Sequence, residues 1–197
     1  MVRLITGSRL VQAGGSDDDA LVRAAQRGDR DAFGTLVSRH ARSILSVVSR
    51  MLGPSDAEDV AQEAFIAAYK ALPRFHFDSK FSTWLYRIAV NKCTDTLRSR
   101  RSDTTSLDAE SDSSAMAWQV ADEETPHSTL EQAELAWELD RQIQALPHLY
   151  RESFVLKHIE GLGYEEMSAI LGVNRDTLKM RVYKARTMLC ERLAHRV

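Results

Sequence analysis

Apolar residues recur every three to four positions along nearly the whole chain, the spacing that places them on one face of an α-helix. The alternation typical of strands is not sustained anywhere, and hairpin turn sequences such as Asn-Gly are absent. The pattern therefore predicts an all-α fold. Helices are expected over residues 17–26, 29 or 31 to 51, 55–72, 82 or 83 to 100, 130–145, 150–159, 164–171 and 174–194.

Residues that cap or break helices mark the expected boundaries. Ser55 and Glu58 have the spacing of a capping box, in which each side chain accepts from the other residue's backbone N–H. Pro73 is expected to end the helix that this pair begins. Asn174 is a favourable N-cap, and Gly172 suits the left-handed end of the preceding helix.

A segment between the helical halves has a different composition. Residues 102–129 contain six Ser and seven Asp or Glu but no Lys or Arg, which is typical of a flexible linker. The chain is therefore expected to comprise an arm (1–16), a first helical domain (17–101), the linker (102–129) and a second helical domain (130–197). Trp118 is the one large aromatic residue of the linker, and both docking on a partner and local packing are open for it.

Charge changes this picture because it is segregated along the chain. The net charge is only −2, yet residues 70–101 carry eight Lys or Arg against two Asp. Residues 170–196 carry seven basic residues against two acidic ones. Two basic segments in a chain that is acidic overall indicate two local surfaces for nucleic acid.

Other classes of protein find little support in the sequence. No apolar run reaches the length of a membrane span, and the N-terminus lacks the apolar region of a signal peptide, so no membrane insertion is expected. Cys93 and Cys190 have neither disulfide nor metal spacing, which favours reduced thiols in a cytoplasmic protein. No nucleophile–base pair or phosphate loop indicates an enzyme, and no cofactor or metal is expected.

The end of the chain has the pattern of a helix-turn-helix. Two helices flank a short turn at Gly172, and the second helix is basic. Arg175 lies at the N-terminal end of that helix, where a bidentate contact to guanine is feasible. A plain amphipathic helix with a solvated basic face is the alternative. The expected DNA contacts are Asn174, Arg175, Asp176, Thr177, Lys179, Arg181, Lys184 and Arg186.

The central helix combines aromatic and basic residues. Bases of single-stranded DNA stack on aromatic rings while cations hold the backbone, and an amide such as that of Asn91 can read a flipped base. The alternative is that several aromatic residues belong to the core, with Phe81 and Leu85 buried. The candidate strand-binding residues are Phe81, Trp84, Tyr86, Arg87, Asn91, Lys92 and Arg98.

The helix that begins near residue 55 carries an acidic cluster. A metal site is disfavoured because no His joins the acids and they do not converge on one face. Complementation of the helix dipole and docking of a basic partner both remain open. The residues of the docking interpretation are Asp56, Glu58, Asp59, Gln62, Glu63 and Phe65.

Several motifs, in order, resemble those of extracytoplasmic-function (ECF) sigma factors of bacterial RNA polymerase. They are DAEDVAQEAF (56–65), FSTWLYRIAVN (81–91), LP (146–147) and EGLGYEEM (160–167). The resemblance covers both helical domains. It implies that these are sigma regions 2 and 4 and that the protein confers promoter specificity without catalytic activity.

The resemblance also implies partners for each surface. The acidic segment would dock on the β′ clamp helices of core polymerase. The central helix would melt and read the −10 element, with Asn91 near a flipped base. The second helix of the helix-turn-helix would read the −35 element, and region 4 would engage the β flap. An anti-sigma factor would occlude the polymerase-binding faces, and the regulon would answer stress or envelope signals.

One segment departs from the family. Where the last helix commonly has Gly-Thr-Val-Lys-Ser-Arg, this chain has Asp176-Thr177-Leu178-Lys179-Met180-Arg181. The substitutions fall where bases are read, so they bear on the −35 sequence rather than on the role. A helix-turn-helix repressor or activator that acts without polymerase docking is the second interpretation. It leaves the central helix and the acidic cluster without a role.

Overall fold

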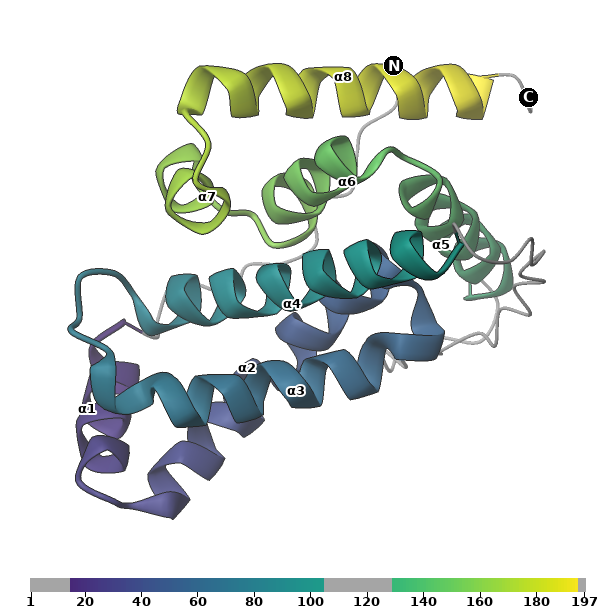
Figure 1. The fold of residues 1–197 in the computed structure, drawn as a ribbon. Helices are drawn as coiled ribbons and strands as arrows, with labels where there is room; N and C mark the ends of the chain where they lie inside the picture. Colours follow the sequence, from purple (N-terminus) through teal and green to yellow (C-terminus); the bar gives the residue numbers. More distant parts are fainter. Residues whose placement is uncertain (1–14, 105–128, 195–197) are drawn as a thin grey trace.

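The computed structural model describes residues 15–104 and 129–194, and every regular element within these ranges is helical (Figure 1). The expected all-α fold is thereby confirmed for the described residues. The elements are α1 (Gly15–Gln26), α2 (Arg30–Leu52), the 3₁₀ turn η1 (Pro54–Asp56), α3 (Ala57–Ala71), the 3₁₀ turn η2 (Leu72–Arg74), α4 (Phe81–Thr104), α5 (Thr129–Gln144), α6 (His148–Phe154), the π-helical turn η3 (Val155–Ile159), α7 (Tyr164–Leu171) and α8 (Arg175–Ala194). The predicted arm lies almost entirely outside the described residues, as do most of the predicted linker and Trp118.

Local chemistry explains how the long helix α2 begins and ends. The Asp29 carboxylate accepts from the N–H groups of Asp31 and Ala32, both at 3.0 Å, and so caps the helix start. Gly53 follows the helix with φ 98°, a conformation that L side chains rarely adopt, and its N–H donates to the Ser49 carbonyl. The helix start expected at Asp29 is confirmed.

The capping box expected at Ser55 and Glu58 is wrong. Pro54 begins a 3₁₀ turn there, so the backbone is already helical at the position where an N-cap would be extended. The Ser55 hydroxyl donates instead to the Asp56 carboxylate at 3.4 Å. Helix α3 therefore begins without a side-chain cap, and its first turn relies on the acidic residues Glu58 and Asp59.

The second half contains the helix-turn-helix in the expected place. Gly172 adopts the left-handed conformation, with φ 65° and ψ 25°, and Asn174 Oδ1 accepts from the Thr177 N–H at 2.8 Å. Both capping predictions are confirmed. A feature that the sequence did not suggest is that Glu166 Oε2 accepts from the Gly163 N–H at 3.0 Å, which fixes the start of α7.

One hydrophobic core runs through both halves of the molecule. In Figure 1, α4 lies between α3 and the helices of the second half, and α8 lies at the outer edge of that half. Helix α4 packs against α7, while α8 packs on α6 through the predicted stripe Leu178, Val182, Ala185 and Leu189. None of the helices in the described ranges is long and apolar enough to cross a membrane.

Candidate nucleic-acid and protein interfaces

Four basic residues of α8 are exposed, and they fall into two groups. The first is Lys184 and Arg186, and the second is Arg175 and Lys179, which pair with nearby acids. Arg175 pairs with Glu165 of α7, and Lys179 Nζ lies 3.0 Å from Asp176 Oδ1. These two pairs are exposed, so water competes for them and a phosphate or a base can displace either partner.

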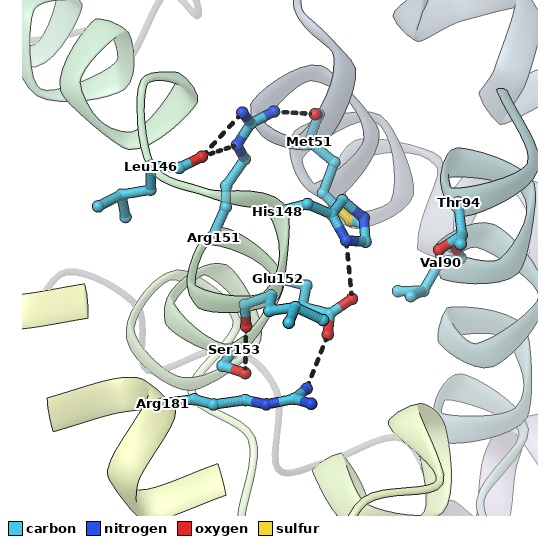
Figure 2. Close-up of polar contacts among 10 residues, drawn as sticks. Met51, Val90, Thr94, Leu146, His148, Arg151, Glu152, Ser153 and Arg181 are labelled. Atoms are coloured by element: carbon cyan, nitrogen blue, oxygen red, sulfur yellow. Dashed lines mark hydrogen bonds and ion pairs between the residues drawn. The ribbon is translucent and has the colours of Figure 1, made fainter. Parts of the chain in front are cut away.

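Arg181 belongs to neither group, because it points into the molecule (Figure 2). Its Nη1 lies 3.1 Å from Glu152 Oε1, and its side chain is only 19% exposed. Burial raises the pKa of Glu152 to about 7, against the opposing effect of the Arg181 charge. In this conformation Arg181 links α8 to α6, so the DNA contact expected for it is not available.

A second half-buried arginine joins the two halves directly. The Arg151 guanidinium donates to the Leu146 carbonyl, at 3.2 and 2.9 Å, and to the Met51 carbonyl (Figure 2). Met51 lies near the end of α2, and Leu146 lies just before α6. One side chain therefore satisfies backbone acceptors on both sides of the boundary, and its burial lowers the pKa of Arg151.

The structure separates the aromatic residues expected to bind single-stranded DNA. Phe81 is 2% exposed and Tyr86 is 4% exposed, so neither ring is accessible to a base. Trp84 is half-buried and lies against Phe75, with ring centroids 5.1 Å apart. The core alternative therefore applies to Phe81 and Tyr86, while Arg87, Asn91 and Arg98 are exposed on α4.

Tyr86 forms part of the boundary between the halves. Its hydroxyl donates to Glu160 Oε2 at 2.6 Å, and Glu160 Oε1 accepts from the Ser46 hydroxyl at 3.2 Å. Burial and the Glu160 carboxylate raise the pKa of Tyr86, so the hydroxyl keeps its proton and remains a donor. Two further contacts across the boundary are Lys80 Nζ to Glu166 Oε1 at 2.9 Å and Arg50 Nε to Asp140 Oδ1 at 3.0 Å.

Asn91 faces the second half across a cavity of about 280 Å³. Val90, Asn91 and Thr94 line it from α4. Glu152 and Arg181 are among the residues that line it from the opposite side. The second half thus covers Val90 and partly covers Thr94, while the Asn91 side chain stays exposed beside the pocket.

The acidic cluster forms an exposed surface at the start of α3. Glu58, Asp59, Gln62 and Glu63 are exposed. Glu63 Oε2 lies 3.1 Å from Lys92 Nζ, and Asp56 pairs with Arg100, so α4 cations neutralise part of the cluster. Within the described residues no group of His, Cys, Asp and Glu could hold a metal ion.

An apolar groove between α2 and α3 adjoins this cluster, and the sequence did not suggest it. It has a volume of about 740 Å³. Glu58 and Gln62 lie at the end near the start of α3, and Arg30 and Lys70 lie at the other end. Ile66 and Tyr69 remain 47% and 45% exposed, because they project away from the buried face of α3. Helical periodicity could have indicated this exposure from the sequence. The other apolar side chains of the groove are Phe33, Val37, Leu45 and Phe65.

Comparison with known proteins matches both halves of the chain. A family model for sigma-70 region 2 matches residues 36–103, and one for sigma-70 region 4 matches residues 136–189. The ECF RNA polymerase sigma-E factor of Escherichia coli K12 is 39% identical over 174 residues, which are 86% of this chain and 90% of that protein. The RNA polymerase sigma-H factor of Pseudomonas aeruginosa is 39% identical over 175 residues, with the same coverage of both chains.

Solved structures give the same fold. The structure of CnrH in complex with the cytosolic domain of CnrY matches with a TM-score of 0.66 and 30% identity, over 90% of this chain and 97% of that one. The sigma factor RpoE of Bartonella quintana, in complex with the anti-sigma factor NepR, matches with a TM-score of 0.66. At 23% identity, over 82% of this chain and 96% of that one, this second likeness concerns the fold alone.

Proposed function

This chain belongs to the extracytoplasmic-function group of the sigma-70 factors, and from that premise we propose that it directs RNA polymerase to promoters through the surfaces described above. Residues 17–101 serve as region 2 and residues 130–197 as region 4. A repressor or activator that uses the helix-turn-helix alone is not favoured, because the region 2 match would then have no role. The chain acts in the cytoplasm as a specificity subunit, and catalysis belongs to the polymerase.

The observation that carries the polymerase-binding proposal is the groove between α2 and α3. Its floor is apolar, and Ile66 and Tyr69 are exposed there, as expected for a surface that a partner helix covers. Glu58 lies at one end and Lys70 at the other, so the charges distinguish the two orientations of a docked helix. The partner that fits is the pair of β′ clamp helices.

Binding to core polymerase tests this role. The double variant Glu58→Arg with Ile66→Asp changes two exposed side chains of the groove and should leave the helical content intact. We expect affinity for core polymerase to fall about tenfold or more, the usual cost of disrupting anchors in an interface. Asp95→Arg reverses an exposed charge on α4 and is the matched control. Equal affinity of the double variant and the control would remove the groove from the interface.

We propose different DNA substrates for the two basic surfaces. Helix α8 reads the −35 element as duplex, through the exposed residues of its outward face. Helix α4 binds the separated −10 strand, with Asn91 reading a base, Trp84 offering a stacking face, and Arg87, Lys92 and Arg98 near the backbone. Because α6, α7 and α8 lie against α4 beside the exposed Asn91, we propose that a strand gains full access to this face of α4 only when the two halves move apart.

A protein regulator is the remaining partner that we propose. CnrH and the Bartonella RpoE were each solved with a bound protein, the cytosolic domain of CnrY and the anti-sigma factor NepR. An anti-sigma factor that covers the α2–α3 groove of this chain would block polymerase directly. Such a regulator would compete with core polymerase for the groove. The double variant described above can be used to measure this competition.

A further inference from the structure

The outward face of α8 is not basic at its centre. With 100° between successive residues, Asp176, Met180, Tyr183 and Thr187 lie opposite the buried stripe of Leu178, Val182, Ala185 and Leu189. Met180 is 55% exposed and Tyr183 is 65% exposed, and both are large apolar side chains on the outermost helix. Exposed apolar groups gathered on one helix face indicate a contact surface.

The charges beside this face indicate what covers it. Lys179 and Arg186 lie on one side of the Met180–Tyr183 line, and Lys184 lies on the other. A helix in the major groove has a phosphate backbone on each side and base edges in front of it. An apolar centre between two basic edges therefore matches duplex DNA better than a protein groove, which would leave the cations without partners.

Several residues that were expected to read DNA have other roles here. Asn174 caps α8 through the Thr177 N–H, and Arg181 is held by Glu152 inside the molecule. Arg175 pairs with Glu165 and lies closer to the buried side of the helix than Met180 does. Among the described residues of α8, those within about 30° of the outward direction are thus Asp176, Met180, Thr187, Glu191 and Ala194, with Tyr183 and Lys184 about 50° to either side.

We propose that Met180 determines specificity by contacting the C5 methyl group of a thymine in the −35 element, with Tyr183 packing beside it. In the major groove that methyl group distinguishes thymine from the other bases, and apolar side chains recognise it. Asp176, one helical turn earlier, accepts from the exocyclic amino group of a neighbouring cytosine, and its pairing with Lys179 at 3.0 Å limits repulsion from phosphates. The inference rests on the proposed −35 role and names its base chemistry.

Replacing thymine by deoxyuracil tests the inference, because it removes only the methyl group. Holoenzyme formed with the full chain would first select its preferred −35 sequence from a randomised duplex. Each thymine of that sequence would then be replaced by deoxyuracil in turn. We expect affinity to fall about fourfold at one position, the usual value of one buried methyl group.

Variants on the same helix assign the contact. With Met180→Ala the thymine and deoxyuracil duplexes should bind equally at that position. Met188→Ala makes the same chemical change on a half-buried side of α8 and should keep the fourfold difference. If the holoenzyme selects a sequence but no deoxyuracil substitution matters, or if Met180→Ala still discriminates, the inference is wrong and the promoter role stands. If no sequence is selected, the proposed −35 role itself is wrong.

Discussion

The two candidate DNA surfaces differ in their accessibility. The outward face of α8 is open, with Met180 55% exposed and Lys184 and Arg186 beside it. The α4 surface around Asn91 is partly covered, because Val90 and Thr94 line a small pocket with residues of α6, α7 and α8 while Asn91 itself is exposed. The open surface suits duplex DNA, which exists before any melting. The covered surface suits a single strand, which exists only afterwards.

Several polar contacts hold the two halves together, beside the hydrophobic core that the halves share. The Tyr86–Glu160 and Arg151–Met51 hydrogen bonds and the Lys80–Glu166 ion pair span the boundary. Water and polymerase can replace these polar partners when the halves separate, whereas the shared hydrophobic core opposes separation. Changes to these contacts should therefore affect the α4 surface and leave the α8 surface as it is.

Removal of Arg151 should have the largest effect. Arg151→Ala leaves the Leu146 and Met51 carbonyls without their donor, which should lower the free energy of unfolding by about 2–4 kcal/mol. Urea denaturation measures this loss. Arg141→Ala is the control, since Arg141 is exposed and pairs within α5 with Glu138, and it should cost no more than about 0.5 kcal/mol. Equal losses in the two variants would contradict the bridging role of Arg151.

Protonation of Glu152 should have the next largest effect, because this residue lies between the two surfaces. Its pKa is about 7 in the fold and near 4.5 when unfolded. Between these values the folded protein alone keeps the proton, so this group makes stability fall as pH rises from about 4.5 to 7 and adds no further change above that. We expect the free energy of unfolding to fall by roughly 3 kcal/mol across this range.

Urea unfolding at pH 5 and pH 8 measures this dependence, with Glu152→Gln as the comparison. Gln cannot titrate, so the stability of the wild type relative to the variant should be greater at pH 5 than at pH 8. His148 Nδ1 lies 3.7 Å from Glu152 Oε2. A parallel measurement with His148→Gln therefore separates any contribution of His148 from the pH dependence of Glu152. A relative stability that does not change with pH would show that Arg181 keeps Glu152 ionised throughout.

Loss of the Glu160 contacts should have the smallest effect on stability. It should also distinguish the α4 surface from the α8 surface most clearly. Glu160→Ala removes the acceptor of the Tyr86 and Ser46 hydroxyls. These hydrogen bonds stabilise the closed arrangement, in which the two halves are packed together, by about 1–2 kcal/mol. If closure competes with strand binding, apparent affinity for a single-stranded −10 oligonucleotide should rise about 5- to 30-fold. Affinity for a −35 duplex should not change.

Fluorescence anisotropy with the two oligonucleotides measures both affinities. Asp31→Ala removes an exposed acid at the start of α2, away from the boundary, and controls for the change in charge. A parallel gain for duplex and single strand would mean that Glu160 acts through general charge repulsion. Unchanged single-strand affinity would mean that the closed arrangement does not restrict Asn91.

Features set by neighbouring residues could be predicted from the sequence. The caps at Asp29 and Asn174 and the left-handed Gly172 follow from a few consecutive residues, and the buried stripe of α8 follows from helical periodicity. The Ser55 capping box failed for an equally local reason. Pro54 sets the backbone there, and it lies one residue before the Ser55–Glu58 motif.

Features set by distant residues could not be predicted in this way. Arg181 has the sequence context of a DNA-binding side chain, yet its partner Glu152 lies on another helix. The same holds for Tyr86, which meets Glu160 only when the two halves pack together. The α2–α3 groove likewise depends on how two helices pair. Periodicity places a residue on a helix face, but it does not show what lies opposite.

The boundary between α4 and α7 joins two parts of a single chain, and this changes the affinity it requires. Within one chain such a contact forms at an effective concentration of roughly millimolar when the tether is short. An association too weak to hold two separate proteins together can then still be populated. Cleavage of the chain between Thr104 and Thr129 should therefore weaken the association of the two halves, and lengthening that stretch should weaken it gradually. The strength of closure is thus adjustable by chain length alone, without any change to the residues that touch DNA or polymerase.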